Sequence, residues 1–407
     1  MVEKMIRKTV FFSLFVFAGL LTSCNSRQVS SLTQRVSIQK MIGIPDAEPD
    51  FASGVSACYG GVIDDLLLIA GGCNFPDLPL TEGGKKRYYK GIYAANRTAD
   101  SVLAWRKVGE LPVAAAYGTT MPIPGGLVFA GGMNEAGSLS SVYRLTLSDD
   151  KQSVILDTLP SLPFNMDNMG GVTVGDQLFV IGGNVNGKPS HSLYSMAVNR
   201  LNETWTQEPS FPGDARVQPA CAAQFSEGGS IYMWGGFAPS VDGSSATLST
   251  DGYCYSLANR TWTPLGMPIG NDSVSISLGG GGAVTLNDSL IACLGGVNKD
   301  IFLEALRRGE GLQKAIVSRH TQEVDRFKAA DSIYLSHPAD WYRFNSKVLV
   351  YNTRRNCWTE LLQHPSVARA GVAIVCSGDT LFSICGELKP GIRTPEINRL
   401  IIHTNSQ

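Results

Sequence analysis

A repeated pattern of short apolar runs, each ending in a glycine doublet, constrains the fold of this chain more than any other feature. Five copies lie at residues 66–72, 127–132, 178–183, 231–236 and 290–296. A sixth, at residues 381–386, continues into Glu387, and we interpret it as a doublet whose second glycine is replaced by this glutamate. The second glycines of the first five copies are 60, 51, 53 and 60 residues apart, and 90 residues separate the fifth copy from Gly386. Self-similarity at such a period indicates a repeat architecture.

Repeats of about 50 residues are typical of kelch propellers, in which each repeat forms one four-stranded blade. Glycine permits the backbone conformations and the close approach that a strand end near a crowded axis requires. The six copies therefore predict an all-β fold, a six-bladed kelch β-propeller that occupies residues 25–407 as one domain. After Gly386 the chain has residues for only one more strand, so we expect residues 37–42 to complete the last blade and remove its open edge.

A tyrosine followed by a tryptophan recurs downstream of four doublets. The pairs are Tyr93 and Trp105, Tyr194 and Trp205, Tyr255 and Trp262, and Tyr351 and Trp358. Because large aromatic side chains bury much apolar surface, we expect these pairs to pack between neighbouring blades.

Residues 1–24 have the pattern of an export signal. A basic leader with Lys4, Arg7 and Lys8 precedes an apolar run that is too short to span a bilayer. The run ends in Leu-Thr-Ser-Cys, which resembles a bacterial lipoprotein box with Cys24 as the lipidated residue. An ordinary secretory signal is the alternative. We expect an exported protein, anchored to a membrane only by lipid at Cys24, that is periplasmic or associated with the outer membrane of a Gram-negative bacterium.

Composition excludes several functions. With 34 basic and 35 acidic residues the net charge is -1, which argues against nucleic acid as a partner. The nine cysteines form no C-x-x-C pair, and the histidines show no ligand spacing, so we expect no metal and no cofactor. The sequence leaves the oligomeric state open.

The 90-residue interval contains the one segment with helical periodicity. From Asp300 to about Arg326 the apolar spacing changes from two towards 3.6 residues. We therefore expect a helical insertion in the fifth blade, at about residues 300–340. The insertion follows the fifth doublet, just as Glu387 lies at the end of the sixth copy, so both belong to the same kind of loop. The insertion is either a cap over a site at these loops or a surface decoration.

The candidate catalytic residues are Glu387 and Arg393. Pro390 and Gly391 predict a tight bend that brings Arg393 back towards Glu387. A carboxylate beside a guanidinium, at a place where the repeat carries glycine, suggests chemistry added to a scaffold. A loop salt bridge is the simpler alternative.

Further polar residues are expected on the same face, because the loops after the doublets and the loops before each first strand open on one side. The candidate substrate-binding residues are Asn74, Asn298, Lys389, Arg216 and Arg369. Amides and cations around one carboxylate suit an anionic, hydroxyl-rich small molecule. Each asparagine alone is explained equally well as a turn residue. The loop at residues 73–90, with its lysines and tyrosines, could add cationic and stacking contacts.

Over nearly all of the mature chain, the sequence resembles the kelch-propeller sialic acid mutarotases, also called N-acetylneuraminate epimerases. The most specific motifs are GELKPGIRT at residues 386–394, GGVNKDIF at residues 295–302 and the tyrosine-rich segment at residues 71–93. In the better-known members the glutamate motif lies in the middle of the chain. The sequence is therefore similar to a circularly permuted branch, since a closed ring can be cut elsewhere without moving its site.

The resemblance implies that the protein interconverts the α and β anomers of N-acetylneuraminate or a related acidic sugar. Glu387 would be the general acid/base and Arg393 would hold the carboxylate of the sugar. Anomer exchange moves a proton off the anomeric hydroxyl and delivers one to the ring oxygen, and a carboxyl group can do both.

Two other functions remain open. A sialidase-like glycosidase would need two catalytic carboxyls or a tyrosine nucleophile with its own acid, and we find only one well-placed acid. A kelch lipoprotein could also bind a sugar or a protein without catalysis.

Overall fold

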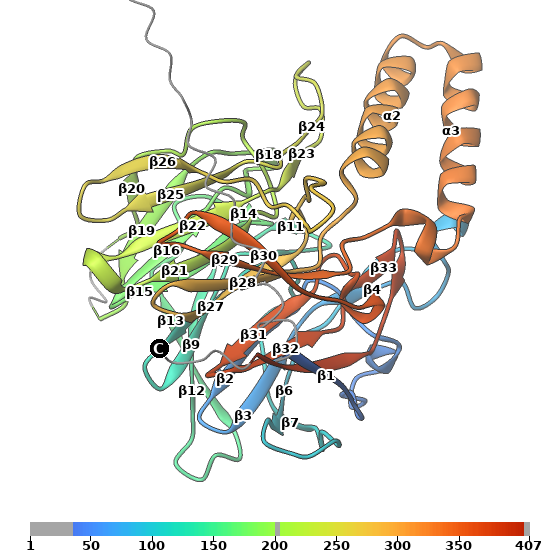
Figure 1. Ribbon diagram of the computed structural model, residues 1–407. Helices are drawn as coiled ribbons and strands as arrows, with labels where there is room; N and C mark the ends of the chain where they lie inside the picture. Colours follow the sequence, from blue (N-terminus) through green and yellow to red (C-terminus); the bar gives the residue numbers. More distant parts are fainter. Residues whose placement is uncertain (1–35, 200–203, 403–407) are drawn as a thin grey trace, which may run out of the picture.

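The computed structural model describes residues 36–199 and 204–402. In this part the chain is mostly β, with six four-stranded antiparallel sheets and two α-helices that project to one side (Figure 1). No helix in the described ranges is long and apolar enough to cross a membrane. The expected signal at residues 1–24, including Cys24, lies outside the described residues.

The first three sheets follow one another along the chain. The first consists of β2 (Tyr59–Ile63), β3 (Leu66–Ala70), β6 (Gly91–Asn96) and β7 (Arg106–Glu110). The second consists of β8 (Thr119–Ile123), β9 (Gly126–Ala130), β12 (Val142–Leu147) and β13 (Val154–Leu159). The third consists of β15 (Gly170–Val174), β16 (Gln177–Ile181), β19 (Leu193–Ala197) and β20 (Thr206–Glu208).

The last three sheets complete the set. The fourth consists of β21 (Ala220–Gln224), β22 (Ser230–Trp234), β25 (Gly252–Ser256) and β26 (Thr261–Leu265). The fifth consists of β27 (Gly282–Asn287), β28 (Leu290–Leu294), β29 (Lys347–Asn352) and β30 (Cys357–Gln363). The sixth consists of β31 (Ala373–Ser377), β32 (Thr380–Ile384), β35 (Ile397–Ile402) and β1 (Val36–Met41).

The sixth sheet joins the two ends of the described chain. β1 pairs antiparallel with β35, from Val36 opposite Ile402 to Met41 opposite Ile397. Figure 1 shows this blue strand beside the red strands of the other end. The N-terminal strand thus covers the edge that β35 would otherwise expose.

Neighbouring sheets pack face to face. The second strand of each sheet is almost wholly buried and mostly apolar, as expected for a strand that is covered on both faces. Six apolar clusters each join two consecutive sheets, and one of them joins the sixth sheet to the first. The core is therefore a closed series of interfaces rather than one central cluster.

A ring of backbone hydrogen bonds lies where the six first strands begin. The residues of this six-residue ring are Ala57, Tyr117, Asn168, Gln218, Gly280 and Gly371, and all have φ between 51° and 76°. Each N–H donates to the carbonyl of the equivalent residue in the preceding sheet, and the N–H of Ala57 donates to Gly371, with lengths of 2.7 to 3.2 Å. A cavity of about 220 Å³ is lined by these residues and by the starts of the first strands.

The glycine doublets end the second strands with a left-handed backbone at both positions. In the sixth copy these positions are Cys385, with φ of 54°, and Gly386, with φ of 106°. The interpretation that Glu387 replaces the second glycine is therefore wrong. Cysteine replaces the first glycine, and Glu387 is the first residue after the doublet. Cys73 occupies the equivalent position in the first sheet.

The tyrosine and tryptophan pairs tie adjacent sheets together, as expected. Tyr255 lies opposite Trp262 across β25 and β26, with ring centroids 5.0 Å apart. The Trp262 indole donates to the carbonyl of Pro209, which follows the last strand of the preceding sheet, over 2.7 Å.

The insertion lies between β28 and β29 and contains two helices, α2 (Lys299–Val317) and α3 (Thr321–Ser336). The sequence predicted a helical insertion here but not its division into two helices. Arg319, between the helices, has φ of 57°, a left-handed conformation that ends the first helix. A 3-10 turn at Ala339–Tyr342 leads back to β29.

Candidate functional site

Glu387 and Arg393 lie directly opposite each other on a small hairpin, β33 (Glu387–Lys389) and β34 (Ile392–Arg393). The Arg393 guanidinium donates to Oε1 of Glu387, and the N–H of Gly391 donates to the same oxygen over 2.8 Å. Gly391 has φ of 83°, a turn conformation that glycine adopts without strain. The six-residue separation therefore produces the contact that the sequence predicted.

The two side chains differ in exposure. The Arg393 side chain is 3% exposed and that of Glu387 is 25% exposed. The Arg393 guanidinium carbon lies 5.1 Å from the centroid of the Phe75 ring, a cation–π contact. Burial lowers the pKa of Arg393, but the Glu387 carboxylate and then Tyr117 and Cys73 raise it on balance. The cation is thus fixed in place, while its carboxylate partner stays accessible.

Arg393 keeps spare hydrogen-bonding capacity. Its Nε is buried, with no hydrogen-bond partner among the described residues. A buried donor of this kind is costly unless something accepts from it.

Glu387 is anchored beside the six-residue ring. Its N–H donates to the carbonyl of Ala370 over 2.7 Å, and the N–H of Ala370 donates back over 3.0 Å. Ala370 directly precedes Gly371 of the ring. Ser56 and Cys73 exchange the equivalent two bonds in the first sheet. The short hairpins after the doublets therefore place Glu387 and Cys73 around the same central opening.

Tyr117 adds a hydroxyl to this region. Its Oη accepts a hydrogen bond from Nζ of Lys86 over 2.9 Å, and the same ammonium lies 4.5 Å from the centroid of the Tyr117 ring. Burial, followed by the charges of Cys73 and Glu387, raises the pKa of Tyr117 well above its ordinary value, and Arg393 opposes the shift. The phenol therefore stays protonated and lies within electrostatic reach of the Glu387–Arg393 pair.

A second carboxylate, Asp167, lies just before β15, the first strand of the third sheet. It is 3% exposed and accepts hydrogen bonds from Ser138, from Asn168 over 2.6 Å and from Asn184 over 2.7 Å. Burial is the main cause that raises the pKa of Tyr88 to about 12, and the charges of Cys73 and Asp167 contribute. Asp167 thus lies within electrostatic reach of Tyr88, and its oxygens are occupied by neutral donors.

The asparagines predicted to bind substrate both have partners within the protein. Asn74 is buried and donates to the carbonyls of Asp50 and Gly54, and it accepts from the Tyr89 hydroxyl over 2.9 Å. It therefore ties together segments that are distant in sequence. Asn298 is the N-cap of α2, where its side chain accepts from the N–H groups of Asp300 and Ile301, a local role of the kind that the turn-residue alternative predicts.

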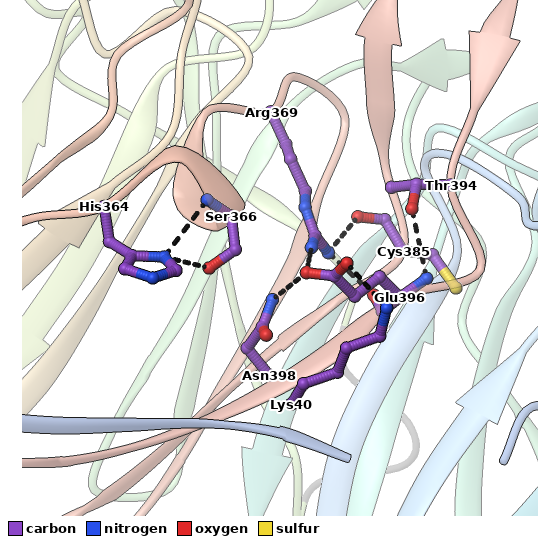
Figure 2. Close-up of polar contacts among 8 residues, drawn as sticks. All are labelled: Lys40, His364, Ser366, Arg369, Cys385, Thr394, Glu396 and Asn398. Carbon is purple, nitrogen blue, oxygen red and sulfur yellow. Dashed lines mark hydrogen bonds and ion pairs between the residues drawn. The ribbon is translucent and has the colours of Figure 1, made fainter. Parts of the chain in front are cut away.

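Arg216 and Arg369 occupy equivalent positions, two residues before the ring, and both are almost completely buried. Arg216 binds both carboxylate oxygens of Asp251. Arg369 donates to a carboxylate oxygen of Glu396 over 2.7 Å and to the carbonyls of Cys385 and Glu396 (Figure 2). In both cases the guanidinium already binds a carboxylate and a backbone carbonyl, and only Nε of Arg369 has no partner among the described residues, which favours a structural role over the predicted substrate contact.

The helical insertion approaches Glu387 from outside the sheets. Lys389 donates to the carbonyls of Leu335 over 3.1 Å and His337 over 2.6 Å, which fixes the end of α3 on the Glu387 hairpin. Burial is the largest cause that raises the pKa of Tyr334 and of Tyr342, and the charge of Glu387 adds to both shifts. A cavity of about 650 Å³, lined by Leu388, Asn298 and Arg343 among others, separates the base of the insertion from the fifth sheet.

Sequence reasoning missed Tyr117 and Asp167. The glycine doublets drew attention to the loops after each second strand, whereas both residues lie just before a first strand. A usable signal was present, because Ala57, Tyr117, Asn168 and Gly371 each lie 15 residues before the second glycine of their repeat. Within the described ranges, no group of three or more His, Cys, Asp and Glu side chains could hold a metal ion.

Comparison with known proteins agrees with this geometry. The family model described as N-acetylneuraminate epimerase matches residues 159–407. The N-acetylneuraminate epimerase of Salmonella enteritidis is 29% identical over 243 residues, which is 60% of this chain and 58% of the relative. That of Brucella melitensis is 28% identical over 239 residues, or 58% of this chain and 57% of the relative. The chain thus spans somewhat under three fifths of the length of the curated relatives it matches.

Proposed function

Because the chain belongs to the N-acetylneuraminate epimerase family, we propose that it interconverts the α and β anomers of N-acetylneuraminate or a related acidic sugar. The observation that carries this proposal is the Glu387–Arg393 pair, a carboxylate that is 25% exposed and is held beside a buried, fixed cation. This arrangement suits a substrate that brings its own carboxylate and whose anomeric hydroxyl must give up a proton.

In the proposed reaction Glu387 takes the proton of the anomeric hydroxyl while the bond between the anomeric carbon and the ring oxygen breaks, and the ring oxygen takes up a proton to become a hydroxyl. The open-chain keto acid then rotates its carbonyl. On closure at the other face that hydroxyl loses its proton again, and Glu387 returns its own proton to the new anomeric oxygen. A positioned acid/base of this kind contributes roughly 10²–10⁴-fold to rate.

Arg393 would bind the carboxylate of the sugar. One terminal nitrogen is engaged by Glu387, and the buried Nε is closed to solvent, so the sugar carboxylate would meet the second terminal nitrogen. The planar guanidinium can therefore hold Glu387 on one side and a substrate carboxylate on the other.

We further propose that the six sheets are the blades of a six-bladed kelch propeller. The closed ring of backbone hydrogen bonds and the cluster that joins the sixth sheet to the first support this architecture. A circular permutation relative to the family's better-known members would explain why the alignment covers only 60% of this chain. We also propose export and lipid attachment at Cys24, from the sequence pattern at residues 1–24.

The proposal is tested by adding the protein to N-acetylneuraminate and following α–β exchange by NMR. Exchange faster than the spontaneous rate is the expected result. Binding of the sugar without any faster exchange would make the protein a binding module instead. Release of sialic acid from a glycoside would indicate a glycosidase.

A further inference from the structure

Tyr117 is the exceptional member of the six-residue ring. All six residues have a left-handed backbone, and the other five are glycine, alanine or amide residues. A bulky aromatic residue in this conformation is strained, and such strain is concentrated at functional sites. The ring bonds on both sides of Tyr117, of 2.9 and 2.7 Å, hold it there.

The hydroxyl of Tyr117 is also specifically supported. Lys86 donates to it over 2.9 Å from the loop between β4 (Cys73–Asn74) and β5 (Arg87–Tyr88). No carboxylate within the described residues forms an ion pair with Lys86. The ammonium therefore approaches the tyrosine oxygen as its polar partner, and it leaves the hydroxyl proton free to point elsewhere.

Anomer exchange needs two proton movements at different atoms. Glu387 serves the anomeric hydroxyl, and the ring oxygen needs a donor when its bond to the anomeric carbon breaks. We propose that Tyr117, oriented by Lys86, supplies and recovers this second proton. This inference rests on the proposed function and adds a named residue to it.

The proton balance is complete within the site. As the ring opens, the carboxylate of Glu387 accepts the anomeric hydroxyl proton, and the phenol of Tyr117 gives its proton to the ring oxygen. On closure, that hydroxyl attacks the other face of the carbonyl and returns its proton to the phenolate. Glu387 then protonates the new anomeric oxygen. The Lys86 ammonium stabilises the transient phenolate by its charge.

The test compares Tyr117→Phe with the parent protein in the NMR exchange assay with N-acetylneuraminate. The variant removes one oxygen and keeps the ring and its backbone, so we expect kcat to fall roughly 10²-fold with little change in KM. Tyr255→Phe is the matched control, because it removes a buried hydroxyl that binds Glu208 in the fourth sheet, and it should keep the parent rate.

Lys86→Met provides a second, independent variant, since Lys86 is only partly buried and lies in the loop between β4 and β5. Lys86→Met should lower kcat strongly in the parent protein. It should not lower kcat further in Tyr117→Phe, because both changes act through the same hydroxyl.

Full kcat in a folded Tyr117→Phe protein would overturn the inference while leaving the proposed function intact, provided that Glu387→Gln is inactive. The pairing of Lys86 with Tyr117 would also be overturned if the double variant lost kcat by the product of the two single losses. A parent protein without exchange activity would remove the proposed function and this inference together.

Discussion

Glu387 and Arg393 face each other across a two-stranded hairpin, and the carboxylate oxygen that binds the guanidinium also accepts the N–H of Gly391. Two donors thus converge on one oxygen of Glu387. This arrangement fixes one end of the carboxylate and leaves the other available to a substrate, which distinguishes it from an ordinary surface ion pair. The predictions below depend on this geometry and on what surrounds it.

Arg393→Lys should weaken binding of the sugar by roughly tenfold or more, since lysine keeps the charge but loses the planar fork and the cation–π contact with Phe75. Isothermal titration with N-acetylneuraminate measures this change. Arg144→Lys, which alters an exposed ion pair with Asp157, is the matched control and should bind as the parent does. Equal affinity in both variants would remove Arg393 from the binding site.

Replacing residues 301–337 with a short glycine-serine linker should weaken sugar binding while the sheets still fold. The two helices bury only Ala315, and Arg308 of α2 forms an ion pair with Asp331 of α3, so they pack against each other. Lys389→Met, which releases the end of α3 without deleting it, should have a smaller effect in the same direction. An unchanged Kd together with an unchanged Tm would make the insertion a surface decoration.

Arg369→Met should lower the free energy of unfolding by about 1–3 kcal/mol, because it leaves Glu396 with only the exposed Lys40 as a cation and leaves the carbonyls of Cys385 and Glu396 without this donor. Arg144→Met removes a more exposed pair and should cost less than about 1 kcal/mol. Urea unfolding of both variants and the parent measures the difference. Similar losses in both variants would contradict the structural role of Arg369.

The contribution of the Arg369–Glu396 pair should also depend on pH. Burial raises the pKa of Glu396, but the Asn398 hydrogen bond and the charges of Arg369 and Lys40 outweigh it and lower the pKa on balance. The stabilisation is therefore fully present above the ordinary glutamate pKa of about 4.3 and is lost as the pH falls through the lower folded value. The difference between parent and Arg369→Met should shrink when unfolding is repeated near pH 3.

Much of the fold could be predicted from the sequence, because glycine doublets end the second strand of five repeats and aromatic pairs recur downstream in four repeats. The error at the sixth doublet has a physical cause. The first doublet position needs a left-handed backbone, and Cys385 adopts it at φ of 54° without glycine. Because the sequence pattern expects glycine at this position, Glu387 was placed one residue too early, at the second doublet position that Gly386 occupies. The break between α2 and α3 was equally hidden, since it depends on the backbone of Arg319 alone.

The site was predictable only where it is local in sequence. Glu387 and Arg393 meet through a hairpin that Pro390 and Gly391 specify. Tyr117 belongs to another repeat, and the sequence does not show how the repeats are placed relative to one another. Arg216 and Arg369 were chosen by their loop position, but the acids that bind them, Asp251 and Glu396, lie 35 and 27 residues further on.

The most direct measurement is the rate of anomer exchange of N-acetylneuraminate by Glu387→Gln. Glutamine keeps the size of the side chain and an oxygen that can accept from Arg393, but it cannot carry a proton. We predict that Glu387→Gln binds the sugar and that its exchange rate falls on the order of 10²–10⁴-fold. Glu110→Gln, on an outer strand, is the control and should keep the parent rate. Exchange by Glu387→Gln as fast as by the parent would contradict the central claim.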